Sequence, residues 1–266
     1  MAPRTRKSAT SEGRMSFVEH LLEARKRLTR AALGIVVGAV AGFFLAPFVL
    51  DILRQPILDI AESRNASLNY DSISGAFDLR MLISIYLGVF ISSPVWLYQI
   101  FAYITPALTL REKRYVFGFF FSAVPLFLVG CAAGFYVFPH IVELLASFAS
   151  EDDTSIFLAK YYFDFAMKLV LVVGIGFVLP VFIVLLNFIG VWSAKGILQG
   201  WRWAILMITL FCAIATPAAD VFSMFLLAIP MIVLYFVAVG IAFWHDRVAS
   251  KRAEKLLADG LGGATT

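Results

Sequence analysis

Long apolar runs separated by short polar segments make up most of this chain. A helix needs roughly 17–25 mostly apolar residues to cross a bilayer, and six stretches approach or reach that length. In chain order they are Ala31–Leu50, Met81–Leu110, Tyr115–Pro139, a stretch from Lys160 to about Val191, Trp203–Ala219 and Val221–Trp244. Helices satisfy their own backbone, and no alternating barrel pattern is present. The sequence therefore predicts an all-α integral membrane protein with six transmembrane helices.

The second stretch, Met81–Leu110, is too long for one straight crossing. Proline removes a helical hydrogen bond and kinks or ends a helix. Pro94 and Pro106 therefore predict a kink, followed by a segment that turns along the membrane surface.

The fifth stretch is short. From Trp203 to Thr216 a helix rises only about 20 Å, whereas the hydrocarbon core of a bilayer is about 30 Å thick. A tight turn joins this stretch to the sixth one. We therefore expect a short hairpin of the fifth and sixth helices, which thins the membrane locally and holds Asp220 deeper than an ordinary loop carboxylate.

Small residues recur at helical spacing in the first stretch, at Gly34, Gly38 and Gly42. This spacing lets two helices approach closely. It fits either packing inside the bundle or a dimer face, and the first interpretation is favoured.

Positive charge gathers on one side of the predicted helices. Most of the 22 lysines and arginines lie before the first stretch, after the second and fourth, or after the sixth. The opposite connections, about Asp51 to Arg80 and His140 to Ile156, lean acidic. Because cytoplasmic loops are enriched in Lys and Arg, we expect both termini in the cytoplasm. The predicted organisation is a basic disordered tail (1–15), a six-helix membrane domain (16–245) and a cytoplasmic C-terminal tail (246–266).

The amino-acid composition agrees with an integral membrane protein, and the two cysteines do not suggest a disulfide. The chain is 61% hydrophobic and 15% charged, whereas soluble domains are about a quarter charged. Cys131 and Cys212 lie in separate apolar runs, and we expect no disulfide between them. The basic start precedes a run that is long enough to span, so the sequence favours an uncleaved helix over a signal peptide.

The motifs of common enzymes are absent from the sequence. His20, His140 and His245 are scattered without metal-ligand spacing. There is no phosphate loop, nucleophile elbow or cofactor fingerprint. We therefore predict no catalytic residue, metal or cofactor, and basic tails beside lipid do not indicate nucleic acid.

The segment His20–Leu28, HLLEARKRL, places a carboxylate among basic residues just before the first apolar run. Ser16 to Glu19 has capping-box spacing and predicts a helix that starts at Ser16. The side chains expected to face water are Glu19, Glu23, Lys26, Arg27 and Arg30, and those expected to face lipid or the bundle are Phe17, Val18, Leu21, Leu22 and Leu28. Glu23 fits either an i,i+4 ion pair with Arg27 or a site for a cationic ligand.

A second carboxylate, Glu112, lies in the basic segment Leu110–Arg114. By itself it is typical of a solvated charge that moderates local repulsion. Glu23 and Glu112 nevertheless share one predicted membrane face. Two carboxylates there can form bidentate hydrogen bonds with a pair of arginines, a geometry that lysine cannot reproduce.

Asp164 and Lys168 stand four residues apart near the outer end of the fourth stretch. They fit either a mutually neutralising pair or a polar contact in a partner-lined groove, because ionisable groups at depth often mark function. Asp220 fits either capping of the turn after Pro217 or a functional contact.

Several segments together resemble the TatC family, the multi-spanning component of the twin-arginine protein translocase. His20–Leu28 resembles the amino-terminal signature of that family, and Pro94–Leu108 followed by Glu112 resembles its second span and first cytoplasmic loop. The further matching segments are Phe177–Pro180, Thr216–Ser223 and Leu227–Pro230. The resemblance covers roughly residues 16–245, with the motifs in the family's order.

The resemblance implies a receptor that binds the Arg-Arg signal peptides of folded proteins at its cytoplasmic face, in the cell membrane of a prokaryote. It implies assembly of a translocation site driven by the protonmotive force, with the single-span proteins TatA and possibly TatB as partners in an oligomer. The implied signal-peptide site consists of Glu23, Glu112, Arg25, Lys26, Leu28 and Tyr103. The implied structural or partner-binding positions are Pro56, Phe77, Pro106, Thr216 and Asp220.

The chain also departs from the family pattern. Ala24 stands where the motif has Leu, Tyr103 where it has Phe, and Met224 where Gln is common. Val178 takes the place of a membrane-buried Glu in the fourth span, and Asp164 and Lys168 are candidates for compensating polarity. The alternative function is a small-solute secondary transporter, which predicts inverted repeats and ionisable groups at the midplane. No convincing repeat relates the two halves.

Overall fold

The computed structural model describes residues 17–64, 67–104, 110–147, 156–215 and 221–262, and it confirms the all-α architecture. Ser16 lies outside the described residues. The helices are α1 (Phe17–Arg64), α2 (Gly75–Ile91), α3 (Ser93–Ile104), α4 (Leu110–Ser147), α5 (Ala159–Phe188), α6 (Ala194–Gln199), α7 (Trp201–Ala215) and α8 (Val221–Gly262). The strands are β1 (Ser67–Asn69) and β2 (Ile156–Leu158).

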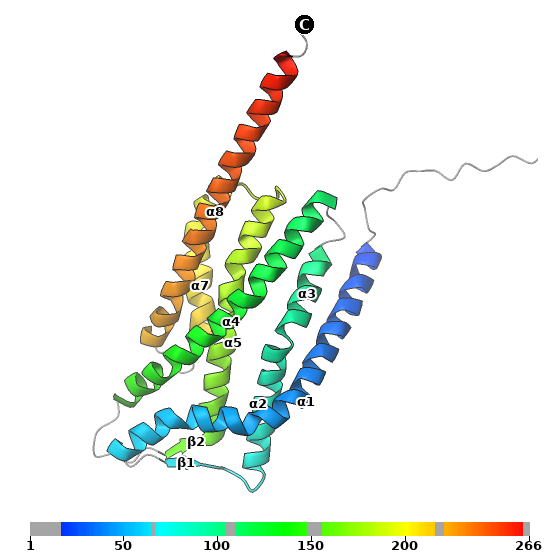
Figure 1. Cartoon of the computed structure of the whole chain (residues 1–266). Coiled ribbons are helices and arrows are strands. Elements are labelled where there is room, and N and C mark those ends of the chain that lie inside the picture. Colours follow the sequence, from blue (N-terminus) through cyan, green and yellow to red (C-terminus); the bar gives the residue numbers. More distant parts are fainter. Residues whose placement is uncertain (1–16, 65–66, 105–109, 148–155, 216–220, 263–266) are drawn as a thin grey trace, which may run out of the picture.

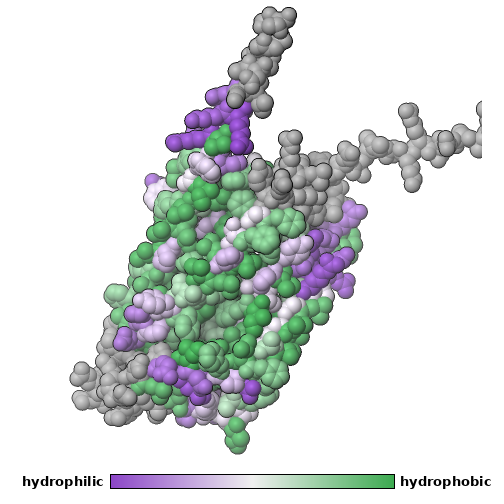
Figure 2. Space-filling model, in the orientation of Figure 1, coloured by the Kyte–Doolittle hydropathy of each residue, from purple (hydrophilic) through white to green (hydrophobic). Residues whose placement is uncertain are grey.

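Most of these helices are long and apolar enough to cross a membrane. Among the described residues, α1, α4, α5 and α8 each meet this condition, α2 and α3 meet it together as a bent pair, and α7 is shorter. Figure 1 shows the start of α1 and the end of α8 at the same end of the bundle. Figure 2 shows a broad apolar face with hydrophilic surface at its ends, as expected for a protein surrounded by lipid.

The kink predicted in the second apolar stretch is confirmed. The axes of α2 and α3 differ by 54°, and the break falls at Ser92. Pro94 lies in the first turn of α3, where its missing N–H is tolerated. Close to the break, the indole N–H of Trp96 donates to the carbonyl of Val89 at 2.9 Å. The segment around Pro106, predicted to turn along the surface, lies outside the described residues.

The first outer connection is not the loop that the sequence predicts. α1 continues from Asp51 through Pro56 to Arg64, and α2 begins at Gly75, before Arg80. Figure 1 shows that α1 changes direction sharply, so that its second half lies across the end of the bundle. Charges and prolines after Leu50 are typical of a loop, but here the segment stays helical and packs on the core. The prediction of Pro56 as a loop residue is therefore wrong.

Pro47 accounts for the change of direction in α1. Because Pro47 has no N–H, the carbonyl of Phe43 loses its usual helical donor. Arg80 of α2 replaces that donor, and its Nε and Nη2 both donate to Phe43 O at 3.2 Å. The guanidinium also lies 4.1 Å from the centroid of the Phe43 ring. One arginine thus satisfies a neighbouring backbone group, as a lipid environment requires.

The glycine repeat of α1 packs inside the bundle, which confirms the favoured interpretation. A Cβ built on Gly38 would lie 2.6 Å from the carbonyl oxygen of Gly88 in α2, and one built on Gly42 would lie 2.7 Å from that of Ser84. A Cβ on Gly88 would lie 2.7 Å from the backbone nitrogen of Ala39. Because these neighbours are backbone atoms, no side-chain rotation can make room. α1 and α2 therefore touch backbone to backbone.

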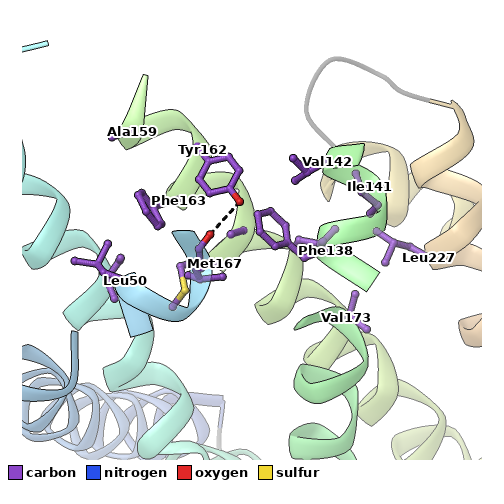
Figure 3. Close-up of a cluster of buried hydrophobic side chains, with 14 of the residues drawn as sticks. Leu50, Phe138, Ile141, Val142, Ala159, Tyr162, Phe163, Met167, Val173 and Leu227 are labelled. Atoms are coloured by element: carbon purple, nitrogen blue, oxygen red, sulfur yellow. Dashed lines mark hydrogen bonds between the residues drawn. The ribbon is translucent and has the colours of Figure 1, made fainter. Parts of the chain in front are cut away.

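α5 is the central helix of the bundle. Of its most apolar segment 61% is buried, compared with 22–33% in the other three long spans. The main core gathers around it from α1, α2, α4, α7 and α8, and Figure 3 shows part of this cluster, with Leu50, Phe138, Phe163 and Leu227 converging. The hydroxyl of Tyr162 donates to the carbonyl of Leu53 at 3.0 Å, which holds the second half of α1 on α5.

A small parallel sheet adds a further tie that the sequence does not predict. β1 pairs with β2 from Ser67 opposite Ile156 to Asn69 opposite Leu158. It links the connection after α1 to the residues just before α5. Strands of three residues are too short to show an alternating pattern, so the sequence offered no signal for them.

The last two helices agree with the prediction in part. α7 has 15 residues, about 22 Å of helix, which confirms a short fifth apolar helix. α8 has 42 residues and continues to Gly262, well past the predicted end at Trp244. The segment predicted as a C-terminal tail, 246–266, is therefore helical over most of its length.

Asp246 of α8 organises the connection between α5 and α7. Its Oδ2 accepts from the backbone N–H of Ala194, the first residue of α6, at 2.8 Å. Its Oδ1 accepts from Nδ2 of Asn187 at 3.0 Å. Asn187 is buried and also donates to the carbonyl of Trp192. A carboxylate at a helix start satisfies a donor that has no helical partner, so Asp246 fixes α6 and the turn before it.

The α1–α2 contact predicts the effect of a single methyl group. Gly88→Ala places that methyl against backbone atoms of α1, and we expect it to lower the free energy of unfolding by about 1–3 kcal/mol, as overpacking does. The matched control is Gly118→Ala in α4, where an added Cβ meets nothing within 4 Å. Thermal unfolding in detergent would measure both variants. Equal melting temperatures would contradict the close contact.

The Asp246 contacts predict a local effect at the start of α6. Asp246→Ala removes the acceptor of the Ala194 N–H, and loss of such a cap costs about 0.5–2 kcal/mol. We expect faster hydrogen exchange at Ala194 and a lower melting temperature. Glu254→Ala, an exposed acid on the same helix, should leave both unchanged. Unaltered exchange at Ala194 in the Asp246 variant would show that the cap is not needed.

Candidate functional site

The amino-terminal end of α1 meets the carboxyl end of α3. The ring of His20 stacks on the ring of Tyr103, with centroids 4.5 Å apart and an interplanar angle of 28°. Tyr103, predicted as a site residue from α3, thus contacts His20, which lies three residues before Glu23 on α1. The kink at Ser92 directs α3 along α1 and allows this meeting (Figure 1).

Glu23 forms the predicted i,i+4 ion pair. Its Oε1 lies 2.6 Å from Nη2 of Arg27. Both side chains are largely shielded, with 24% of Glu23 and 17% of Arg27 exposed. The prediction that Arg27 faces water is therefore wrong, because the residue turns toward α3 and α4 instead. A pair this shielded is stronger than an exposed one, since less water screens it.

An apolar groove of about 460 Å³ lies beside this ion pair. Its lining residues are Leu21, Ala24, Arg25, Arg27, Leu28 and Ala31 of α1, and Gln99, Ile100 and Tyr103 of α3. Three predicted site residues, Arg25, Leu28 and Tyr103, line it. Lys26 is exposed and is not among its lining residues. Leu28, predicted to face lipid or the bundle, is 72% exposed at the groove.

Two polar atoms beside the groove lack partners in the described part of the chain. They are Nε of Arg27 and Oε1 of Gln99, both buried. Buried polar groups are normally hydrogen-bonded, so an unpaired donor and an unpaired acceptor beside one groove favour a ligand with polar groups of its own. Arg27 also lines a smaller hollow of about 120 Å³ with Phe101 and Phe120.

Sequence reasoning did not select Arg27 and Gln99 as site residues. Arg27 was considered only as the partner of Glu23, and Gln99 lies inside an apolar run without a motif of its own. The signal that could have found Gln99 is its spacing of four residues from Tyr103, which places both on one face of α3.

Glu112 lies in the first turn of α4, which begins at Leu110. Its side chain is outside the described residues. Figure 1 places the start of α4 at the same end of the bundle as the start of α1. The backbone is thus compatible with a second carboxylate at this end.

Asp164 connects two helices inside the bundle. Its Oδ1 accepts from the hydroxyl of Tyr86 in α2 at 2.9 Å, and its Oδ2 lies 2.5 Å from Nζ of Lys168. The neutralising pair predicted as one alternative is therefore present, with an additional partner that the sequence did not suggest. Lys168 is 57% exposed and Asp164 24%.

Phe77 and Val178, which the sequence also singles out, lie away from the groove. Phe77 is exposed in the first turns of α2 and lines a different hollow. Val178 is 3% exposed and packs with Leu97, Phe127 and their neighbours in an apolar cluster. Pro56 lies in α1 with its side chain outside the described residues. Pro106, Thr216 and Asp220 are also outside the described residues, so their predicted roles stay predictions.

Metal chemistry has no candidate site in the described ranges. No group of three or more His, Cys, Asp or Glu side chains there could hold a metal ion. Cys131 and Cys212 are both free thiols, in line with the predicted lack of a disulfide. The groove offers charge, hydrogen-bonding groups and apolar surface.

The fold defines a polytopic α-helical membrane protein, with an apolar groove between α1 and α3 at one end of the bundle. Comparison with known families then gives a specific assignment. The family model described as "Sec-independent protein translocase protein (TatC)" matches residues 19–230. The chain belongs to the TatC family.

Curated relatives and solved structures agree with this family. The chain is 42% identical to a Sec-independent protein translocase protein TatC of Xylanimonas cellulosilytica, over 90% of this chain and 87% of the relative. It is 34% identical to a TatC protein of Rothia mucilaginosa, over 92% and 85%. A crystal structure described as the twin arginine translocase receptor TatC superposes with a TM-score of 0.74 at 28% identity, covering 85% of this chain and 99% of that one. A second one, in DDM, has a TM-score of 0.75 at 30% identity.

The Asp164 contacts predict an order of stabilities. Asp164→Leu leaves the Lys168 ammonium without its carboxylate inside the membrane, where an unpaired charge costs about 3 kcal/mol. Tyr86→Phe removes one hydrogen bond, worth about 1 kcal/mol. We expect Asp164→Leu to unfold most easily in detergent and Tyr86→Phe to be intermediate. The double change of Asp164 and Lys168 to Leu should recover most of the loss. A double variant as unstable as Asp164→Leu would refute the pairing argument.

Proposed function

We propose that the protein is the receptor subunit of a twin-arginine translocation complex and binds Arg-Arg signal peptides at the end of the bundle that carries Glu23. The observation that carries this proposal is a shielded carboxylate at the edge of an apolar groove. The two superposed crystal structures, each described as a twin arginine translocase receptor, support the same function.

The arginine pair of a signal peptide fits this carboxylate. Nη2 of Arg27 lies 2.6 Å from Oε1 of Glu23, and the two oxygens of a carboxylate together can accept from a second guanidinium as well. Hydrogen bonds to charged groups contribute about 1.5–3 kcal/mol each, and the planar guanidinium fork pairs with a carboxylate better than an ammonium does. Glu112, in the first turn of α4, supplies the second carboxylate in this proposal. Arg25 and Lys26 flank the site and set the orientation of the peptide.

The groove suits the part of a signal peptide that follows the arginines. Signal peptides carry an apolar segment after their positively charged start. Leu21, Leu28 and Ile100 line the groove with apolar surface, and Tyr103 closes it on the α3 side. The unpaired Oε1 of Gln99 and Nε of Arg27 can bond to peptide backbone groups. The carboxylate thus suits the arginines of the signal peptide, and the apolar lining beside it suits the apolar segment that follows them.

We further propose a topology of six crossings with both termini in the cytoplasm. The positions of the start of α1 and the end of α8 at one end of the bundle (Figure 1) fit an even number of crossings, with α7 as the short fifth one. The Lys and Arg distribution then orients the Glu23 end toward the cytoplasm. This places the site where newly folded proteins are available, in a prokaryotic cell membrane.

Assembly partners follow from the same family role. We propose that single-span TatA- and TatB-like proteins dock near Thr216 and Asp220, in an oligomeric complex driven by the protonmotive force. With Val178 buried in apolar surroundings, the polar contact at depth falls to Asp164 and Lys168. The alternative, a small-solute secondary transporter, has no support from the family assignment.

The carboxylates predict the outcome of a cross-linking experiment. Glu23→Gln keeps the size of the side chain but loses its charge, and we expect binding of a photo-reactive twin-arginine signal peptide to membranes to weaken about tenfold or more. The combined change with Glu112→Gln should abolish the cross-link. Membrane insertion and protein level should remain as in the wild type.

The matched control is Glu143→Gln, an exposed acid toward the other end of α4. It should cross-link like the wild type, and a peptide with two lysines in place of two arginines should cross-link poorly to every variant. Wild-type cross-linking in the double variant would remove Glu23 and Glu112 from the site.

A further inference from the structure

A second hollow lies at the end of the bundle opposite Glu23. Its volume is about 410 Å³, and it sits between the bend of α1 and the start of α2. Its lining residues are Phe43, Pro47, Leu50, Asp51 and Arg54 of α1, Tyr70, and Ala76, Phe77 and Arg80 of α2. The function proposed above makes no use of this hollow.

Two arginines share the hollow with a single acid. Arg80 uses Nε and Nη2 on the carbonyl of Phe43, which leaves Nη1 and its two hydrogens for another acceptor. Arg54 donates from Nη2 to the hydroxyl of Tyr70 at 3.2 Å. Its contact with Asp51 is long, at 3.5 Å, and Asp51 is 72% exposed. Among the side chains that the structure describes, the hollow therefore has more positive than negative charge, and it has guanidinium donors without an acceptor in that part of the chain.

The level of the hollow along the membrane axis is that of lipid headgroups. The apolar run of α1 ends at Leu50 and the charged Asp51 follows, so the bilayer surface falls between them. Phe44, Phe48 and Phe77 are exposed in the same part of α1 and α2. These rings supply apolar surface beside the hollow, and its lining also includes Tyr70, a residue type enriched at membrane–water interfaces. The apolar side chains and the two arginines of the hollow thus lie at the same depth, that of the lipid headgroups.

We infer that this hollow binds the phosphate of a phospholipid headgroup. Arginine forks suit phosphate oxygens, which accept several N–H groups at once. Arg54 and Arg80 would bind the phosphate oxygens, the Tyr70 hydroxyl would add a donor, and Phe77 would contact the acyl chains. A lipid bound there holds the bend of α1 against α2. A carboxylate from a partner protein would find the same charge, but the surrounding aromatic surface favours a ligand with apolar chains.

The test uses the full-length protein purified in dodecylmaltoside. Dioleoylphosphatidylglycerol is added in steps, and the melting temperature and the mass of bound lipid are measured. Dioleoylglycerol, with the same chains and no phosphate, and inorganic phosphate, with no chains, serve as comparison ligands. The variants are Arg54→Gln and Tyr70→Phe, with Arg202→Gln as the control, because Arg202 lies at the start of α7 and away from the hollow. Arg80 is left intact because it also satisfies the Phe43 carbonyl.

We expect the phospholipid to raise the melting temperature of the wild type and of Arg202→Gln with the same midpoint. In Arg54→Gln the midpoint concentration should rise about tenfold, as loss of a charged hydrogen bond implies, and Tyr70→Phe should show a smaller rise. Equal midpoints for Arg54→Gln and Arg202→Gln would overturn the proposal. So would an equal effect of dioleoylglycerol, or full stabilisation by inorganic phosphate alone.

A photo-reactive residue at position 70 in intact membranes separates lipid from protein. Cross-linking to phospholipid supports the proposal, and cross-linking to a single-span protein in its place overturns it. None of these measurements involves a signal peptide. The lipid site and the receptor function can therefore fail independently.

Discussion

Direct contact between the backbones of α1 and α2 is the constraint on which the rest of the structure depends. Gly38 and Gly88 allow the two helices to touch without intervening side chains, and only at this separation can Arg80 reach the carbonyl that Pro47 leaves free in α1. The same contact fixes the two ends of α1. At one end it holds Glu23 beside α3, and at the other it shapes the hollow with Arg54. The α1–α2 interface therefore supports the packing of the bundle, the hydrogen bond to the Phe43 carbonyl and both candidate sites. Small residues let the two helices pack closely, which drives helix association in lipid.

Three acidic side chains in the described part of the bundle each have a partner on a neighbouring turn or helix. Glu23 pairs with Arg27, Asp164 with Lys168 and Tyr86, and Asp246 with the start of α6 and Asn187. Such pairs are expected where water is scarce, because unpaired charges are costly there. These pairs also provide specific polar contacts between helices or turns in a largely apolar molecule. At the groove, Nε of Arg27 and Oε1 of Gln99 are buried without partners in the described structure, which is why the groove suits a ligand with polar groups.

The sequence predicts the helices well because length and hydropathy report directly on burial in lipid. It locates the kink near Pro94, the short fifth helix and the Glu23–Arg27 pair, all of which depend on neighbours in the chain. It fails where long-range contacts decide. Pro56 indicates a loop, yet packing of α1 on Tyr162 keeps the segment helical. Arg27 appears solvated by spacing alone, but α3 and α4 cover it. The roles of Asp246 and Gln99 depend on partners that no local pattern connects. The sequence also indicates the TatC family. Each matching motif is short, but the set of motifs in this order is specific to that family.

The pairing of Glu23 with Arg27 affects how signal peptides would bind and leave in the function proposed above. A receptor whose carboxylate already holds an internal guanidinium does not take up cargo into a vacant charge site. In the function proposed above, a guanidinium of the signal peptide joins Arg27 at Glu23, so the carboxylate is paired before and after binding. The gain in free energy on binding is then smaller than it would be for a carboxylate with no partner. In this proposal the receptor can select arginine and still release each signal peptide quickly, so that the next one can bind.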